Sequence, residues 1–600
     1  MTISSIPLAT MDLQVGSSGR RNPTLICAPI MADSVSQMLN LVKNAKDQGA
    51  DLVELRLDFL KSFSPRQDLE ALIKQSPLPT LVTYRPKWEG GQYEGDEKAR
   101  LDALRVALEL GSDYIDVELK VADEFFNSVQ GKKPGNVKVI VSSHNYESTP
   151  SSEELGNLAA RIQATGADIV KIATTATEIT DCARIFQLLA HSQVPTIAIA
   201  MAERGYISRI LSGKYGAFLT FGTLEAGVGS APGQPTLKDL LELYNFRQIG
   251  SDTKVHGVIG KPIGHSKSPH LYNAAFKSVN FNGIYLPLLV DSVANFIKAF
   301  SSPDFVGYSY TIPHKEDGLR CCDEVDPIAQ AIGAISCMVR RSDGTLMGYN
   351  VDYLGAIAAI EEALRAREGT NGAASPLVGK LFVVIGAGGA GKALAYGGYE
   401  KGARVVVANR TYEKAQELAN KVGGKAITLE ELENFHPEDG MILANTTSVG
   451  MKPNIDRTPL SKKALSHYSL VFDAIYTPKL TRLLREAQEC GATPVYGTEM
   501  FINQAFVQFE RFTGMPGRLF ISKKPSESWI ICFKLDYDDL KSIHFPICSS
   551  KAIDQGHISK KHVKMVSLCQ SWEGSNLCFF QENAIFTFLS HAMNCELILY

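Results

Sequence analysis

Short apolar runs alternate with amphipathic stretches through the first 245 residues of the chain. The runs predict eight strands; they read PTLICAPIM, LVELRLDFL, PTLVTYRP, YIDVELK, VKVIVSSHNY, IVKIATTA, PTIAIAMAERG and FLTFGTLEA. Segments between them, such as SVSQMLNLVKNAKDQGA and SSEELGNLAARIQATGA, have helical periodicity and end in a glycine followed by a small residue. Eight strand–helix units in about 225 residues match the size of a (β/α)8 barrel, which we predict for residues 23–245.

Polar side chains gather at the predicted C-terminal ends of these strands, where a barrel of this type has its active site. They are Glu54, Arg56, Arg85, Glu89, His144, Lys171 and Arg209. Lys171 lies inside the apolar strand ADIVKIATT, so it either snorkels to an edge or has a chemical role. Held in a mostly apolar barrel, its amine would be driven towards the neutral, nucleophilic form.

Lys171, His144 and Arg209 together fit one kind of reaction. A neutral amine condenses with a ketone, and the resulting iminium acidifies the neighbouring carbon. A histidine can take that proton and return it to a departing hydroxyl, and an arginine binds a carboxylate with two hydrogen bonds. The residues therefore predict dehydration of a carboxylated β-hydroxyketone. A class I aldolase, which also uses a barrel lysine, is the competing interpretation.

Six stretches in order resemble type I 3-dehydroquinate dehydratase over residues 23–245: ELRLD, YRPKWEGG, SSHNY, GADIVKIA, MAERGYISR and SAPGQ. The resemblance implies that Lys171 is the Schiff-base lysine and His144 the general acid/base, oriented by Glu89. It also implies substrate contacts from Glu54, Arg56, Arg85, Arg209, Ser230 and Gln234. In MAERG, Ala202 stands where the family pattern has glycine, which questions the packing near Met201.

The second half contains the stretch LFVVIGAGGAGKALAYGGYEKGARVVVANRT, which predicts a strand, a glycine-rich turn, a helix and a second strand. The glycines Gly386, Gly388, Gly389 and Gly391 permit a tight turn and close approach of a pyrophosphate to the helix N-terminus. At the end of the second strand, Asn409, Arg410 and Thr411 replace the acidic residue of NAD-binding versions. An arginine there suits a 2′-phosphate, so we predict NADP(H), no metal, and a Rossmann domain over residues 351–484.

Loops before this motif, GKPIGHSKSPHLYN, GYSYTIPHK and GYNVD, are dense in hydroxyls and turn formers. Lys315 and Asp352 in them make either a proton-donating pair beside a ketone or a simple salt bridge. With NTTSVGM, FDAIYTP and GTEMFINQAF, these loops resemble shikimate dehydrogenase over about residues 255–516. Its substrate-binding domain is expected over residues 253–350, completed by residues 485–516.

The resemblance to shikimate dehydrogenase assigns roles to further residues. It implies that Ser266 and Ser268 hold a carboxylate, and that Lys315 with Asp352 handles the proton. The other residues that it places around the substrate or the nicotinamide are Thr311, Tyr476, Gln504, Gly497 and Met500. The first domain would make the substrate of the second, and fusion in this order resembles the plant bifunctional 3-dehydroquinate dehydratase/shikimate dehydrogenase family.

Ser336, in GAISC, departs from the asparagine of the family pattern. Serine offers one short hydroxyl, and loss of a hydrogen bond to a ring hydroxyl would cost about 1–3 kcal/mol. One alternative is therefore a dehydrogenase shifted towards quinate or weakened. A second alternative is a non-catalytic scaffold that retains the same folds.

Composition adds limits to these predictions. With 45% hydrophobic residues, 21% charged residues and a net charge of -3, the chain has no basic block and no long apolar run. We therefore expect small-molecule substrates, no nucleic-acid or membrane partner, and a monomer. The N-terminal stretch is Ser-rich, as a plastid transit peptide would be, but it is short and carries Asp12, so we expect a cytoplasmic location with a plastid as the alternative. Residues 521–600 match neither family, and we predict a poorly ordered tail.

Overall fold

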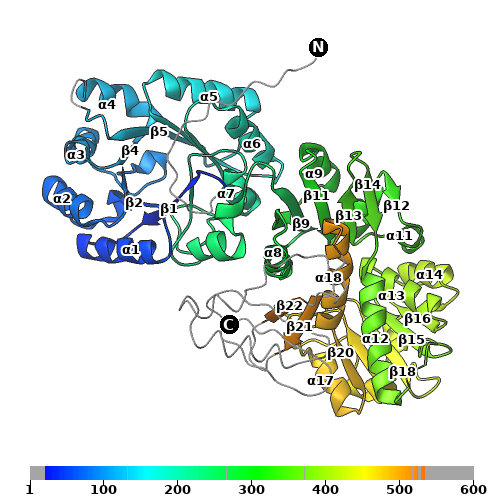
Figure 1. Cartoon of the computed structure of the whole chain (residues 1–600). Helices are drawn as coiled ribbons and strands as arrows, with labels where there is room; N and C mark the ends of the chain where they lie inside the picture. The colour runs from blue at the N-terminus through cyan, green and yellow to red at the C-terminus, as the bar shows by residue number, and fades with distance from the viewer. Residues whose placement is uncertain are drawn as a thin grey trace, which may run out of the picture. The chain divides into compact units, whose positions relative to one another are not determined.

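The computed structural model describes residues 21–130, 133–264, 266–370, 372–515, 519–523 and 529–533 (Figure 1). The described residues fall into two compact units. The first unit holds the residues up to 273 together with 282–306, and the second holds 274–281 and the residues from 307 onwards.

Eight parallel strands form the barrel of the first unit, as the sequence predicts. They are β1 (Leu25–Ile30), β2 (Leu52–Arg56), β3 (Thr80–Thr83), β4 (Tyr114–Glu118), β5 (Lys138–His144), β6 (Ile169–Thr175), β7 (Thr196–Met201) and β8 (Leu219–Phe221). Their order is β7-β6-β5-β4-β3-β2-β1-β8, and the Phe218 N–H donates to the Thr196 carbonyl at 2.8 Å, which nearly closes the ring between β8 and β7.

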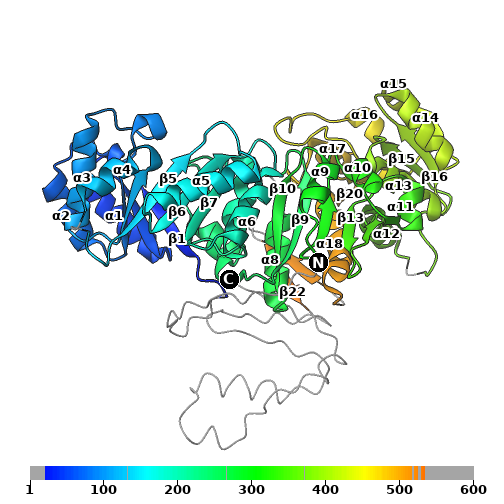
Figure 2. The ribbon, with the colours of Figure 1, turned by 90° about the horizontal axis from the view of Figure 1, so that it is seen from above.

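Helices cover the outside of this ring (Figure 1 and Figure 2). They are α1 (Val35–Asp47), α2 (Pro65–Gln75), α3 (Glu97–Glu109), α4 (Ala122–Ser128), α5 (Ser152–Ala164), α6 (Asp181–His191) and α7 (Tyr206–Ile210). Local sequence sets their starts: α5 begins with a capping box in which Ser151 and Glu154 satisfy each other's backbone N–H groups.

Side-chain alternation divides the barrel interior into layers. One residue from most strands fills an apolar layer: Cys27, Leu52, Leu81, Ile140, Ile169, Ile197 and Leu219. Two positions further along a strand, the next side chain points to the same interior at the C-terminal end. This step leads from Leu52 to Glu54, from Ile140 to Ser142 and from Ile169 to Lys171. The polar layer thus rests on an apolar floor.

The segment after the barrel begins a second α/β region. Its elements are β9 (Lys254–Gly260), α8 (Ser268–Ser278), β10 (Gly283–Leu289), α9 (Val293–Ala299), β11 (Phe305–Tyr310), α10 (Lys315–Arg320), β12 (Glu324–Val325), α11 (Pro327–Ile332), β13 (Cys337–Arg340) and β14 (Leu346–Tyr349). β9 pairs with β10 in parallel, and β13 pairs antiparallel with both β11 and β14.

A doubly wound parallel sheet completes the second unit, which confirms the expected Rossmann fold. Its strands are β15 (Leu381–Ile385), β16 (Arg404–Ala408), β17 (Lys425–Ile427), β18 (Met441–Asn445), β19 (Tyr468–Asp473) and β20 (Thr493–Tyr496), in the order β17-β16-β15-β18-β19-β20. The helices are α12 (Asp352–Glu368), α13 (Gly389–Glu400), α14 (Tyr412–Lys421), α15 (Leu429–Leu432), α16 (Lys462–Leu465), α17 (Arg482–Glu489) and α18 (Gly497–Thr513). The order reverses between β15 and β18, where such sheets bind dinucleotides.

Part of the predicted tail belongs to a two-stranded antiparallel sheet, formed by β21 (Leu519–Lys523) and β22 (Trp529–Phe533). The rest of residues 521–600 lies outside the described residues. Among the residues that the structure does describe, no helix combines the length and apolarity needed to cross a membrane.

Candidate active sites

Lys171 lies at the centre of the polar layer in the barrel, and only 4% of its surface is exposed. Its Nζ lies 2.6 Å from Asp116 Oδ2 and 3.6 Å from Glu54 Oε1, so the expectation of a mostly apolar environment is wrong. The strand that carries Lys171 is apolar, but the two side chains that reach Lys171 across the barrel interior, from β4 and β2, are acidic. Asp116 was missed by the sequence analysis, although YIDVELK places an acid at alternate positions of an otherwise buried strand.

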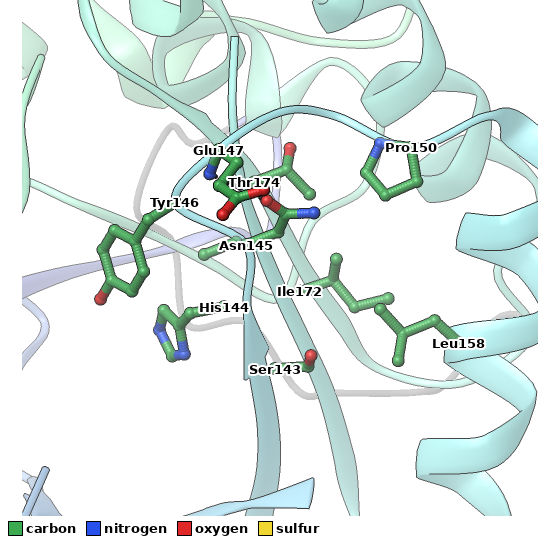
Figure 3. A pocket seen from close by; sticks show the side chains of 10 residues that line it. Ser143, His144, Asn145, Tyr146, Glu147, Pro150, Leu158, Ile172 and Thr174 are labelled. Atoms are coloured by element: carbon green, nitrogen blue, oxygen red, sulfur yellow. Dashed lines mark hydrogen bonds between the residues drawn. The ribbon is translucent and has the colours of Figure 1, made fainter. Parts of the chain in front are cut away.

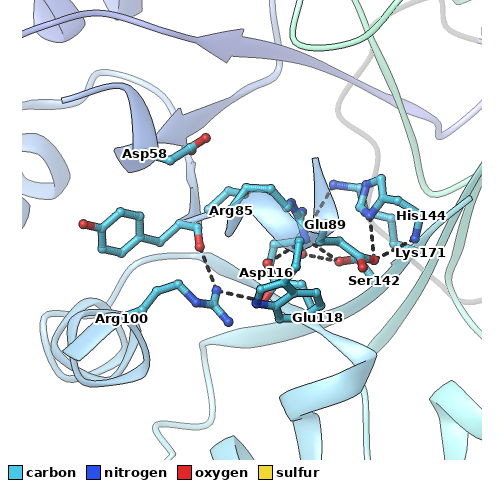
Figure 4. A network of polar contacts seen from close by, with 12 residues as sticks. Asp58, Arg85, Glu89, Arg100, Asp116, Glu118, Ser142, His144 and Lys171 are labelled. Atoms are coloured by element: carbon cyan, nitrogen blue, oxygen red, sulfur yellow. Dashed lines mark hydrogen bonds and ion pairs between the residues drawn. The ribbon is translucent and has the colours of Figure 1, made fainter. Parts of the chain in front are cut away.

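Arg85 joins Asp116 to a second buried acid, Glu118 (Figure 4). Its Nη2 lies 2.9 Å from Asp116 Oδ1, and its Nη1 lies 2.8 Å from Glu118 Oε1. Burial alone would raise the pKa of Asp116, but the charges of Arg85 and Lys171 outweigh it and hold that pKa well below its usual range. Asp116 is therefore a permanent anion beside the lysine amine, able to stabilise an ammonium or an iminium.

His144, at the end of β5, is held by Glu89 from the loop after β3. Glu89 Oε1 accepts a hydrogen bond from the His144 backbone N–H at 2.8 Å and lies 3.3 Å from Nδ1. Burial, and then the positive charge of Arg85, lowers the pKa of His144 well below its usual value. The imidazole is therefore neutral at pH 7 and able to accept a proton.

Arg209, on α7, is the one arginine of this cavity that its surroundings leave without a counter-charge in the described part of the chain. It is 2% exposed, its Nε has no hydrogen-bond partner, and burial lowers its pKa to about 10. Arg56 is equally buried but forms two hydrogen bonds with Asp58, at 2.9 and 2.7 Å. Because an unpaired buried cation costs free energy, Arg209 is positioned to bind an anionic group of a ligand.

All the barrel residues named in the sequence analysis as site residues line one cavity, except Glu89. Glu89 does not line the cavity but contacts His144, which does. The lining residues include Glu54, Arg56, Arg85, His144, Lys171, Arg209, Ser230 and Gln234. Gln234 Nε2 donates to Ser230 Oγ at 3.2 Å, which links the two residues of the loop after β8.

A second pocket shares His144 but lies around the end of β5, towards helix α5 (Figure 3). Leu158, Ile172 and Pro150 form its apolar side, opposite the rings of His144 and Tyr146 in this view. Ser143 and Ile172 line it because they alternate with Ser142 and Lys171 and so face away from the barrel interior.

In the second unit, Lys315 and Asp352 form an ion pair that is largely buried. Asp352 begins α12, and its backbone N–H donates to Asn350 Oδ1 at 3.1 Å. Just before it, the Val351 N–H donates to Ser336 Oγ at 2.8 Å. Ser336 is 1% exposed, so its hydroxyl oxygen already serves the backbone at the start of this helix.

Helix α18 packs against α12 and brings Gln504 against the first turn of α12, which Asp352 begins. A Cβ on Gly355, one turn after Asp352, would lie 2.9 Å from the Gln504 backbone nitrogen, so glycine permits the close approach. One turn after Gln504, Gln508 donates to the Ser336 carbonyl at 3.3 Å and accepts from Ser309 Oγ. The sequence analysis missed Gln508, although its spacing of four places it on the same helix face as Gln504.

The glycine-rich loop fits a pyrophosphate. Gly386 has a φ of +109°, and a Cβ on Gly391 would lie 2.0 Å from the Gly386 carbonyl oxygen. Gly389 begins α13, so the helix N-terminus is open to the loop. After β16, Arg410 is exposed and forms no ion pair within the described residues, while Asn409 Nδ2 donates to the Thr411 carbonyl at 2.9 Å.

The remaining expected residues have less direct evidence. Ser266 Oγ accepts a hydrogen bond from the Ser268 N–H at 3.3 Å. Both serines belong to the first unit and Lys315 belongs to the second, so a shared substrate site for these three residues stays a prediction. In the second unit, Thr311 precedes α10, Tyr476 stacks on Phe501, and Gly497 and Met500 lie in the first turns of α18. Their contacts with a ligand also stay predictions.

Family profiles match almost the whole described chain. Residues 26–251 match type I 3-dehydroquinase, and residues 258–338 match the shikimate dehydrogenase substrate binding domain. Residues 371–474 match shikimate/quinate 5-dehydrogenase, and residues 497–517 match the shikimate 5′-dehydrogenase C-terminal domain.

Individual proteins give the same result. The chain is 63% identical over 510 residues to the chloroplastic bifunctional 3-dehydroquinate dehydratase/shikimate dehydrogenase of Arabidopsis thaliana, covering 84% of this chain and 85% of that protein. It is 37% identical to the shikimate dehydrogenase (NADP(+)) of Caldanaerobacter subterraneus, covering 44% of this chain and 94% of that protein. The solved shikimate 5-dehydrogenase of Thermus thermophilus, in complex with NADP(H) and shikimate, is 32% identical with a TM-score of 0.38, covering 44% of this chain and 94% of that one.

Proposed function

The chain belongs to the bifunctional 3-dehydroquinate dehydratase/shikimate dehydrogenase family of the shikimate pathway, and on that premise we propose how its side chains divide the work. The barrel dehydrates 3-dehydroquinate to 3-dehydroshikimate through a Schiff base on Lys171. The second enzyme reduces 3-dehydroshikimate to shikimate with NADPH. The observation that carries the first assignment is one cavity that combines Lys171, neutral His144 and Arg209, which has no counter-charge among the described residues.

In the barrel, the Arg209 guanidinium binds the substrate carboxylate and directs the ketone to Lys171. The Lys171 nitrogen adds to the carbonyl carbon, the carbonyl oxygen leaves as water with the two protons that the lysine ammonium gives up, and the resulting iminium acidifies the adjacent C–H bond. His144, oriented by Glu89, removes that proton and delivers it to the departing hydroxyl, which leaves as water. A second water then hydrolyses the iminium, releasing 3-dehydroshikimate and Lys171. The anion of Asp116 stabilises the iminium throughout.

In the second enzyme, Lys315 forms an ion pair with Asp352 and gives a proton to the carbonyl oxygen of 3-dehydroshikimate. Gln504, Thr311, Tyr476, Ser266 and Ser268 are assigned to the substrate. The bound cofactor supplies a hydride to the carbonyl carbon. Gly386, Gly388, Gly389 and Gly391 would hold its pyrophosphate; Asn409, Arg410 and Thr411 would hold its 2′-phosphate; Gly497 and Met500 would lie near its nicotinamide. NADP(H) is supported by the tight glycine loop and by Arg410, which forms no ion pair among the residues that the structure describes.

Product analysis tests this assignment. The chain supplied with 3-dehydroquinate and NADPH should consume NADPH and accumulate shikimate. Accumulation of 3-dehydroshikimate with NADPH unchanged would contradict the second activity, and recovery of unreacted 3-dehydroquinate would contradict the first.

A shift towards quinate is the second candidate for the dehydrogenase, favoured by the environment of Ser336. Its hydroxyl oxygen accepts from Val351 N–H, which leaves one donor hydrogen and one lone pair, on a side chain shorter than asparagine, for a ring hydroxyl. The variant Ser336→Asn should raise shikimate turnover and change the shikimate-to-quinate ratio while the dehydratase rate stays fixed. An unchanged ratio would exclude Ser336 as a determinant of specificity.

The plastid alternative for the location of the chain is supported by the chloroplastic relative, and the cytoplasmic expectation is not confirmed. The small-molecule ligands follow from the two activities, and the expectation of a monomer stays a prediction.

A further inference from the structure

Arg100 is a fully buried cation on α3, a helix that lies outside the barrel. Its Nη1 donates to the Tyr84 carbonyl at 2.7 Å and lies 2.8 Å from Glu118 Oε2. Towards solvent, its Nε, at 3.0 Å, and its Nη2 both donate to Oε1 of the partly exposed Glu97. The other arginine of this helix, Arg105, remains partly exposed and pairs with Asp102. Burying a full charge is costly, so a buried arginine at this position indicates a compensating role for its contacts inside the barrel.

From Arg100 the charges alternate without a gap to the reacting lysine (Figure 4). The links beyond Glu118 are Arg85, Asp116 and Lys171, at 2.8, 2.9 and 2.6 Å between charged atoms. The side chains along this path are at most 6% exposed, so water screens them little. In such a network the position of each charge depends on both of its neighbours.

We propose that Arg100 is a positioning residue for the dehydratase: by placing its charge beside one oxygen of Glu118, it fixes the Arg85 guanidinium that holds Asp116 against Lys171. This inference rests on the proposed Schiff-base role of Lys171. Without Arg100, Glu118 keeps Arg85 as its only cationic partner on this path and draws the guanidinium towards itself. Asp116 then loses its second cation and no longer fixes the amine. Arg209, which takes the substrate carboxylate, is not part of the path.

The expected signature is therefore a loss of kcat with little change in KM. In the full-length protein, Arg100→Met should lower the dehydratase kcat about tenfold to a hundredfold, with KM for 3-dehydroquinate within about threefold. Arg100→Lys keeps the charge and should recover most of the loss. Arg105→Met, on the same helix, is the matched control and should leave both constants unchanged. Dehydrogenase activity of the same chain gives an internal measure of protein concentration.

A double variant covers the case in which Arg100→Met does not fold. Arg100→Met/Glu118→Gln leaves no unpaired carboxylate behind, so it should fold, and it should still show the reduced kcat because the neutral amide at position 118 fixes the Arg85 guanidinium less firmly than the paired carboxylate does. A normal kcat in either folded variant, or a loss that Arg100→Lys does not relieve, would overturn the inference. Failure of the proposed function looks different: the unmodified protein would then give no borohydride adduct on Lys171, which would overturn both.

Discussion

At the scale of single residues, two buried arginines in one cavity have opposite electrostatic situations. Arg56 is neutralised by Asp58, whereas Arg209 lacks a counter-charge within the described residues and has its pKa lowered to about 10 by burial. A lowered pKa on a base means that the folded state disfavours the charged form. At neutral pH, Arg209 therefore destabilises the ligand-free fold, and the substrate carboxylate removes that cost when it binds.

Arg209→Met should accordingly raise stability while it weakens binding. We expect the ligand-free barrel to gain roughly 1–3 kcal/mol and KM for 3-dehydroquinate to rise about tenfold to a hundredfold, since a charge-assisted contact is lost. Denaturant unfolding and steady-state kinetics measure the two effects. Arg56→Met is the control and should lower stability, because it leaves Asp58 buried without its cation. A loss of stability in Arg209→Met would show that Arg209 has a partner in the folded chain.

The backbone conformation at Ala202 explains why the family pattern has glycine at this position. Its backbone has φ of 68° and ψ of 175°, a region that costs a residue with a Cβ about 1–3 kcal/mol. Ala202→Gly removes this strain but adds freedom to the unfolded chain, worth about 0.5–1 kcal/mol. The barrel should gain on the order of 1 kcal/mol in thermal unfolding. A lower melting temperature would mean that the surroundings of Ala202 need its methyl group.

At the scale of elements, the sequence predicts which side chains each strand carries, but not which side chains of different strands contact one another. Apolar alternation was enough to find eight barrel strands and to locate Lys171 and His144 at their ends. Asp116 and Arg100 were missed because their roles depend on the pairing of β4 with its neighbours and on the packing of α3, which alternation does not encode. The same limit explains the wrong expectation of an apolar environment for Lys171, since its two carboxylates come from other strands.

The β15–α13–β16 unit sets the cofactor preference at this scale. Arg410 follows β16, is exposed, and has no ion pair in the described part of the chain, so it is available for a 2′-phosphate. Arg410→Asp should reduce the preference for NADPH over NADH by about tenfold to a hundredfold, because an attractive charge becomes a repulsive one. Comparison of kcat/KM for the two cofactors tests this. Equal use of both by the unmodified protein would contradict the assignment.

At the scale of the whole molecule, the chain carries two sets of catalytic residues on two separate folds. Lys171, His144 and Arg209 belong to the barrel, whereas Lys315 and Asp352 belong to the second unit. The motifs alone predicted two folds, because the spacing of strands and helices along the sequence differs between the two halves. They did not predict the β21–β22 pair, since residues 519–533 show no sustained alternation to indicate a partner strand.

Two independent sites should respond to substitution independently. Lys171→Ala should abolish dehydration of 3-dehydroquinate and leave reduction of added 3-dehydroshikimate within about twofold of normal, because the substitution lies in the barrel whereas Lys315 and Asp352 belong to the second unit. Separate assays of the two half-reactions measure this. Loss of both activities in a folded protein would show that the sites depend on each other.

The Schiff base on Lys171 is the central claim for the barrel, and reductive trapping tests it most directly. Borohydride added to the full-length protein with 3-dehydroquinate should reduce the iminium to a stable amine, and peptide mapping by mass spectrometry should find the adduct on Lys171. Borohydride without substrate is the control and should leave the lysine unmodified. An adduct on a different lysine, or a protein that turns over substrate yet yields no adduct, would contradict the account.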